Sequence, residues 1–289
     1  MNGKKILITG SDGMLGSNLT KLLPYKTVGF NSTELDVTDL KKCIQVLENE
    51  KPNVVIHAAA YTDVDGCELN PDKAYKINTV GTQNLVNCCI DKDVLFIYIS
   101  STGVYGEVKE KDPYTEFDEV HPTTIHHSSK YEAEKIVKNH LNRYLILRTG
   151  WLFGGEKTHS KNFVYKRYLE ASNNNVIYSD DSQIGNPTYI KDLVRQIQIL
   201  IESNQVGVFN CVNKAFSVSR YDYVKKIVSL LDLSCEVKKV SSDFFIRKAK
   251  VSKNESATNY KLELLNLNIM ENWDSALNKY IAQIVRDLK

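Results

Sequence analysis

Residues 4–16 read KKILITGSDGMLG, an apolar run that leads directly into a segment with glycines at positions 10, 13 and 16. Apolar residues on successive positions predict a strand whose sheet is covered by helices on both faces. The polar residues that follow predict a turn, and the chain from Met14 onward predicts a helix. The stretch therefore predicts a strand–turn–helix unit, the opening of a parallel α/β sheet.

The glycine spacing is typical of a turn that binds a dinucleotide. Gly10 lets the chain turn sharply off the strand, Gly13 lets the backbone approach a pyrophosphate, and Gly16 lets the helix pack closely on the sheet. Unpaired N–H groups and the positive end of the helix dipole then face the phosphates. A tight turn without a ligand is the alternative. We predict that NADPH or NADH binds here, with contacts from Gly10, Gly13, Met14, Leu15 and Gly16.

The same alternation continues through the first half of the chain. It predicts a doubly wound parallel sheet, a Rossmann-like α/β fold, over residues 1–150. Residues 151–289 are more irregular and predict a smaller, interleaved lobe that binds substrate, with some segments returning to the first domain. The strands are predicted at 4–10, 26–30, 53–60, 94–100, 143–149, 175–178, 206–210 and 235–239, and the helices at 14–23, 39–50, 72–91, 128–140, 161–172, 190–203, 219–231 and 273–287.

The composition excludes several classes of function. The chain has 289 residues, 42% of them hydrophobic, and a formal net charge of +2 without blocks of like charge, so no nucleic-acid partner is predicted. Six scattered cysteines and the lack of a long apolar N-terminal run predict a cytoplasmic protein with no membrane segment. His121, His126 and His127 lack metal-ligand spacing, so no metal site is predicted.

Further cofactor contacts are predicted after the second and third strands. At Asn31 an acid would favour NAD and an arginine NADP, and because neither is present the choice of cofactor stays open. Asp36 could contact the adenine or could be a turn residue, and the alanines at 58–60 could let a cofactor cross the sheet or could simply pack tightly. The predicted contacts are Asn31, Asp36, Val37, Ala58, Ala59, Ala60 and Tyr61.

Four more segments join the glycine turn in a recognisable order. They are HAAAYTDVDGCE (57–68), INTVGTQNL (77–85), RTGWLFG (148–154) and SQIGNPTYIKDL (182–193). Together the five segments resemble the extended short-chain dehydrogenase/reductase superfamily and, within it, the dTDP-4-dehydrorhamnose reductase-like group. The resemblance implies reduction of a keto-sugar linked to a nucleoside diphosphate, with hydride from NADH or NADPH, in cell-surface polysaccharide biosynthesis. It also implies a homodimer.

The resemblance implies a catalytic set of a serine or threonine, a tyrosine, and a lysine four residues after the tyrosine. The hydroxyl polarises the substrate carbonyl, the tyrosine donates the proton, and the lysine lowers the tyrosine pKa and holds the nicotinamide ribose. Ser101 and Lys130 match two of these positions. The third position holds His126 in place of tyrosine.

Three interpretations of His126 stay open. Its imidazolium could donate the proton, although the charge of Lys130 would disfavour that form. Tyr105 or Tyr131 could supply the proton instead, or the reaction could need none there. The chain could also have kept the site but changed its chemistry, as a regulatory subunit that binds cofactor and nucleotide sugar, or as an epimerase or dehydratase with a bound cofactor.

Substrate contacts are implied by the resemblance alone. Each has a structural alternative, because Trp151 could be a core residue, Asn162 a helix N-cap and Gln183 part of a turn. The family's Arg-Pro segment, expected near 250–256, is missing, which suggests an unusual sugar or slow turnover. The implied contacts are Thr102, Gly103, Val104, Trp151, Asn162 and Gln183.

Overall fold

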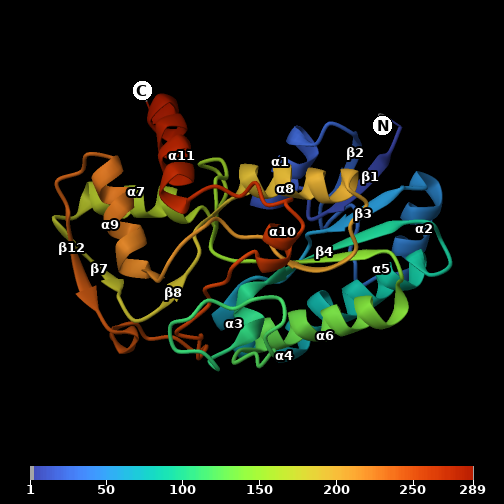
Figure 1. Cartoon of the computed structure of the whole chain (residues 1–289), viewed down its shortest axis with the longest axis horizontal. Coiled ribbons are helices and arrows are strands. Elements are labelled where there is room, and N and C mark those ends of the chain that lie inside the picture. The colour runs from blue at the N-terminus through green and yellow to red at the C-terminus, as the bar shows by residue number, and fades with distance from the viewer. Residues whose placement is uncertain (1–2, 289) are drawn as a thin grey trace.

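A parallel sheet forms the core of the larger part of the protein, at the right of Figure 1. It has six strands in the order β10-β5-β4-β3-β1-β2. This computed structural model describes residues 3–288, so residues 1, 2 and 289 of the predicted domains lie outside it. The doubly wound Rossmann-like fold is confirmed. The strands are β1 (Lys5–Thr9), β2 (Lys26–Phe30), β3 (Val54–His57), β4 (Leu95–Ser101), β5 (Tyr144–Thr149) and β10 (Gly207–Asn210).

Helices cover both faces of this sheet (Figure 1). On one face Ile6 and Ile8 pack under α1 and α8, and on the other Leu7 packs under α2, α5 and α6. Because successive strand residues point to opposite faces, burying both faces requires the near-continuous apolar runs in the sequence. These helices are α1 (Met14–Leu22), α2 (Leu40–Glu50), α5 (Gly81–Cys89), α6 (Ile125–His140) and α8 (Ile190–Glu202).

The single helix predicted at 72–91 is instead a chain of shorter pieces. They are α4 (Pro71–Tyr75), the π-helix η1 (Lys76–Val80) and α5, and a separate helix, α3 (Val64–Leu69), precedes them. Pro71 lacks an N–H group, so it can begin α4 but cannot continue α3. Within η1, Asn78 turns inward, and its amide bonds both the N–H and the carbonyl of Tyr61. The interruption thus fixes the segment that follows β3.

The second half of the chain forms a smaller lobe, at the left of Figure 1. Its core surrounds Tyr223, which lies among helices α7, α9 and α11. The lobe contains two-residue strands that are too short to show an alternating pattern in the sequence. Its elements are α7 (Phe163–Asn173), α9 (Arg220–Leu230), α11 (Trp273–Leu288), β6 (Leu152–Phe153), β7 (Val176–Asp180), β8 (Ile184–Gly185), β9 (Thr188–Tyr189), β11 (Val218–Ser219), β12 (Glu236–Val240) and η3 (Ser242–Phe244).

Two elements from beyond residue 150 return to the first domain, one as a strand of the sheet and one as a helix that covers it. Strand β10 pairs with β5, and α8 packs on the same face as α1. The short helix α10 (Tyr260–Leu264) contributes Leu262 to this core. All six cysteines are buried free thiols. Over residues 3–288 no helix has the length and apolar character needed to cross a membrane.

Candidate functional site

The turn between β1 and α1 is built from glycines that no other residue could replace without backbone movement. Gly10 has φ +68°, and a Cβ there would lie 2.8 Å from the Ala59 nitrogen. A Cβ on Gly16 would overlap the carbonyl of Gly10. At Gly13 a Cβ would meet only the Gly10 oxygen, at 3.3 Å, so its outer side is open. The exposed approach to the N-terminal amides of α1 fits a pyrophosphate.

The predicted adenine side lies beside this turn, because Ser11 N donates to the carbonyl at the end of β2 at 3.1 Å. Asn31 folds the next residues into a turn, and its own N–H donates to Glu34 Oε2 at 3.0 Å. Asp36 accepts a hydrogen bond from the following turn, and Val37 is buried. An acid therefore stands at the end of β2 after all. Sequence reasoning missed Glu34 because it considered only the residues adjacent to the strand.

The segment after β3 is anchored to both neighbouring elements. Ala59 N donates to Thr9 Oγ1 at 3.2 Å, which holds the alanines at 58–60 against the glycine turn. Tyr61 is tied through its main chain to Asn78 and, at its carbonyl oxygen, to His126. The predicted cofactor segment and the predicted catalytic helix are thus directly connected.

His126 lies in the first turn of α6, which is capped by the Thr124 side chain. Its Nδ1 lies 3.1 Å from the carbonyl oxygen of Tyr61. Because a carbonyl can only accept, Nδ1 carries the hydrogen, and a neutral ring then has its lone pair on Nε2. Burial, aided by the charges of His127 and Lys130, lowers the His126 pKa well below its usual value. At neutral pH the His126 ring is therefore neutral, with Nε2 as an acceptor.

Lys130 follows one helical turn later and is buried beneath the end of β4. Its Nζ donates to the carbonyl of Ile99 at 2.5 Å and lies 4.2 Å from the centre of the Tyr98 ring. Burial lowers its pKa to about 7, although the charge of Glu134 opposes the shift. The amine is thus fixed in position and titrates far below the range of an exposed lysine.

Ser101 ends β4 and begins the 3₁₀ turn η2 (Thr102–Tyr105). Its Oγ accepts from Gly103 N at 3.2 Å, which leaves the hydroxyl hydrogen free to donate to a substrate carbonyl. Thr102, Gly103 and Val104 are buried, and a Cβ on Gly103 would overlap the His127 ring. The end of β4 and the start of α6 are therefore in direct contact.

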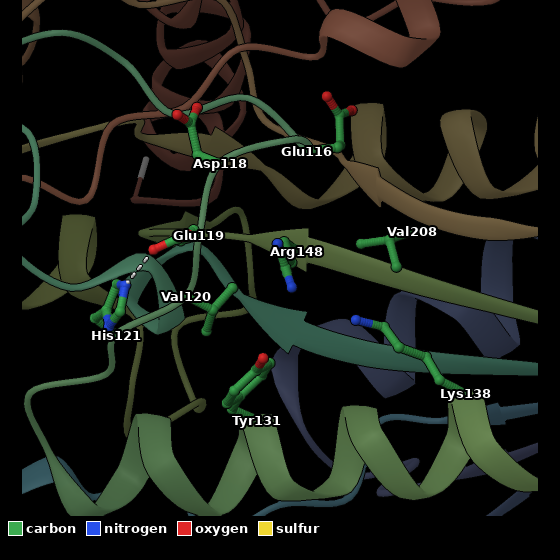
Figure 2. Close-up of a pocket in the computed structure, with 9 residues that line it drawn as sticks. All are labelled: Glu116, Asp118, Glu119, Val120, His121, Tyr131, Lys138, Arg148 and Val208. Carbon is green, nitrogen blue, oxygen red and sulfur yellow. Dashed lines mark hydrogen bonds and ion pairs between the residues drawn. The ribbon is translucent and has the colours of Figure 1, made fainter.

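The two alternative tyrosines point elsewhere. Tyr105 is fully buried, with its hydroxyl donating to Asn210 at 2.8 Å. Tyr131 lines a separate cavity of about 360 Å³, where it projects from α6 toward Arg148 beside Lys138 (Figure 2). Neither hydroxyl shares the contacts that join His126 to the end of β3. The structure gives no support to either tyrosine as the proton donor.

The other three predicted substrate residues fall into two groups. Trp151 and Gln183 lie together: both contact Arg220, whose guanidinium carbon lies 3.5 Å from the centre of the Trp151 ring and whose Nε lies 3.4 Å from Gln183 Oε1. The Trp151 Nε1 donates to Glu255 Oε2 at 2.8 Å. Sequence reasoning missed Arg220 and Glu255.

Asn162, by contrast, is bonded entirely within the protein. It is fully buried, caps α7 by accepting from Tyr165 N, and donates to the Gly155 carbonyl and the Tyr280 hydroxyl. Its role toward substrate stays a prediction. Among residues 3–288, no three His, Cys, Asp or Glu side chains are grouped so as to hold a metal ion.

The parallel sheet, its glycine turn, and the placement of Ser101 and Lys130 at the end of β4 define an α/β protein of the short-chain dehydrogenase/reductase type. The chain belongs to the RmlD substrate binding domain family, whose sequence model matches residues 4–286. The resemblance seen in the sequence motifs is thereby confirmed.

Three similar proteins illustrate the family. The dTDP-4-dehydrorhamnose reductase of Mycobacterium tuberculosis is 31% identical over 288 residues, covering 96% of this chain and 93% of the relative. The spore coat polysaccharide biosynthesis protein SpsK of Bacillus subtilis is 26% identical over 282 residues, covering 96% and 97%. The crystal structure of dTDP-4-dehydrorhamnose reductase from Bacillus anthracis, in complex with NADP, is 31% identical with a TM-score of 0.92, covering 97% and 99%.

Proposed function

We propose that this protein reduces a keto-sugar linked to a nucleoside diphosphate, using NADPH or NADH, in the biosynthesis of a cell-surface polysaccharide. The relatives named above support the reaction class and the polysaccharide setting. One observation in this chain carries the proposal. The glycine turn after β1 and the Ser101–Lys130 pair beside β4 lie at the same edge of one parallel sheet, where ligands of such folds bind.

The residues of this chain divide the work between them. Gly10, Gly13 and the first turn of α1 would hold the pyrophosphate, and Lys130 the nicotinamide ribose. The bound cofactor supplies the hydride. The free hydrogen of Ser101 would donate to the substrate carbonyl oxygen and stabilise the negative charge that develops on it.

Proton delivery is the step at which this chain departs from its family's pattern. His126 can donate from Nε2 only as an imidazolium, and its lowered pKa makes that form scarce at neutral pH. The protonated fraction increases as the pH falls toward that pKa, so proton donation by His126 would favour acidic conditions.

The proposal is tested by adding dTDP-4-dehydrorhamnose to the purified protein and following cofactor absorbance with NADH and with NADPH. Oxidation of either cofactor that depends on the sugar nucleotide is expected. A protein that binds cofactor yet transfers no hydride to any of a panel of nucleotide-linked keto-sugars would contradict the proposal.

A second candidate is a regulatory subunit that binds cofactor and nucleotide sugar without turnover. The neutral, accepting state of His126 favours it, because the usual donor is missing. The His126→Tyr substitution separates the candidates. A large gain in reductase activity would indicate a degraded site, whereas a loss would show that His126 has its own catalytic role. His140→Tyr, on the exposed end of α6, is the matched control.

A further inference from the structure

Arg220 occupies an electrostatically unfavourable position. It is the first residue of α9, directly after the N-cap Ser219. The N-terminal end of a helix carries a partial positive charge, so a cation there is repelled where an acid would be stabilised. Asp222, in the same turn, is engaged by the capping box with Ser219. The helix therefore gains nothing from the arginine at this place.

Burial adds a second cost. Arg220 is partly buried, and desolvation lowers its pKa to about 10. Of its guanidinium nitrogens only Nε has a hydrogen bond, to Gln183 Oε1, and within the described chain neither Nη atom has a hydrogen bond or an ion pair. A buried charge without a close counter-ion is costly to retain and commonly marks a functional group.

The nearest acids are held by other partners. Glu255 lies close enough to influence Arg220, but its Oε2 accepts from Trp151 Nε1 and no ion pair with Arg220 forms. Asp180 also acts on Arg220 from a distance, and its Oδ1 accepts from Ser182. Arg247 adds a further positive charge nearby. Glu255 and Asp180 thus favour the charged guanidinium from a distance, but among residues 3–288 neither forms an ion pair with it.

Trp151 fixes the orientation of the open group. The guanidinium lies against the indole at 3.5 Å, which occupies one of its faces and leaves the in-plane N–H groups at its edge. An arginine edge held in this way matches two oxygens of a phosphate. The contact with Gln183 places this edge among the residues that the resemblance assigns to the sugar-nucleotide cleft.

We infer that Arg220 is a substrate-binding residue whose Nη groups bind the diphosphate of the nucleotide sugar. The inference rests on the proposed function for the identity of the anion. It assigns Trp151 a supporting role, because the indole packs against the guanidinium of Arg220 and its Nε1 donates to Glu255.

The test measures binding without catalysis. Calorimetry with dTDP, and separately with thymidine, is performed on the wild type, Arg220→Gln, Arg220→Lys and the control Arg143→Gln, which removes a surface arginine paired with Asp93. Arg220→Gln should weaken dTDP binding at least about tenfold, as expected for loss of a charge-assisted hydrogen bond. Arg220→Lys should weaken it less. Thymidine binding, which involves no phosphate, should be unchanged in every variant.

The outcomes separate this inference from the proposed function. Unchanged dTDP affinity in Arg220→Gln, or equal loss for dTDP and thymidine, overturns the role of Arg220, since the second result would indicate a structural defect. A folded wild-type protein that binds neither dTDP nor UDP, GDP or CDP would contradict the proposed function itself, and the inference with it.

Discussion

The cofactor side and the substrate side of the proposed cleft are formed by different kinds of atoms. The cofactor side is formed by main-chain atoms, where glycines bring backbone close to backbone and the amides of α1 are left open. The substrate side is formed by long side chains from separate segments, with Arg220 stacked on Trp151 and Glu255 held beside them. The cofactor side depends on the space between backbones, and the substrate side depends on the placement of charged side chains. Substitutions should therefore damage them in different ways.

The largest effect of a substitution is expected on the cofactor side, which is formed by main-chain atoms. Gly16→Ala places a methyl group on the carbonyl of Gly10, so the helix must move from the sheet and the free energy of unfolding should fall by about 3 kcal/mol. Gly13→Ala brings its methyl group within 3.3 Å of the Gly10 oxygen, which needs only a small backbone shift and should cost at most about 1 kcal/mol, yet the methyl group obstructs the approach of phosphate and cofactor affinity should fall. Urea unfolding and cofactor titration measure the two effects, with Gly3→Ala as the control. Equal free energies of unfolding for Gly16→Ala and Gly13→Ala would contradict the claim that Gly16 is required by the close approach of two backbones.

Lys130 tests the effect of a buried charge on stability and on activity. The pKa of its amine is about 7 when folded but about 10.4 in an unfolded chain, so between these values the unfolded state binds more protons. The free energy of unfolding should therefore rise with pH from about 7 to about 10. Lys130→Met should flatten this rise, measured by urea unfolding at pH 7 and pH 9, and should lower reductase activity at least about a hundredfold. Lys135→Met, on the exposed side of α6, should do neither. A steep rise retained in Lys130→Met would show that other groups control it.

His126 combines features of both sides, because a main-chain carbonyl fixes the tautomer of its side chain. Wild-type reduction should accelerate as the pH falls from 8 to 6, since more of the imidazole becomes protonated. His126→Gln should abolish this acceleration and lower the rate about tenfold or more at pH 6. A pH–rate profile of kcat for both proteins is the measurement. An identical profile in the variant would exclude His126 as the acid.

The smallest effect concerns the choice of cofactor. The carboxylate of Glu34 accepts a hydrogen bond from the first peptide N–H after β2, and an acid at this end of the strand favours NAD over NADP in such folds. We expect a preference for NADH that Glu34→Gln reduces several-fold, an effect of about 1 kcal/mol for an exposed charge. The ratio of kcat/KM for the two cofactors measures it, and Glu48→Gln, on the exposed face of α2, serves as the control. If Glu34→Gln leaves this ratio unchanged, Glu34 does not influence the choice between NADH and NADPH.

Much of the fold could be predicted because its signals are local. The strands from residue 4 to residue 149 and the glycine turn are each specified by a few consecutive residues, and the structure has them close to the predicted positions. The interruption at 76–80 could not be predicted, because it depends on Asn78 bonding to a distant main chain. Glu34 escaped notice because only the folded turn brings it back to Asn31.

The substrate side was harder to predict for the same physical reason. Trp151, Arg220 and Glu255 lie far apart in the sequence and meet only in the tertiary structure. One local signal was available, since an arginine directly after a helix-capping serine opposes the helix dipole. A residue that is unfavourable for its own helix is a candidate for function elsewhere.

The return of β10 and α8 to the sheet has a consequence for engineering. Strand β10 protects the open edge of β5, and α8 covers the apolar face beside α1. A fragment ending after β5 would expose both an unpaired edge and bare core, and such surfaces aggregate. The substrate lobe therefore cannot be replaced by that of another protein through a single junction near residue 150. A folded chimera must take the lobe from the donor protein and keep segment 190–210 from the host protein.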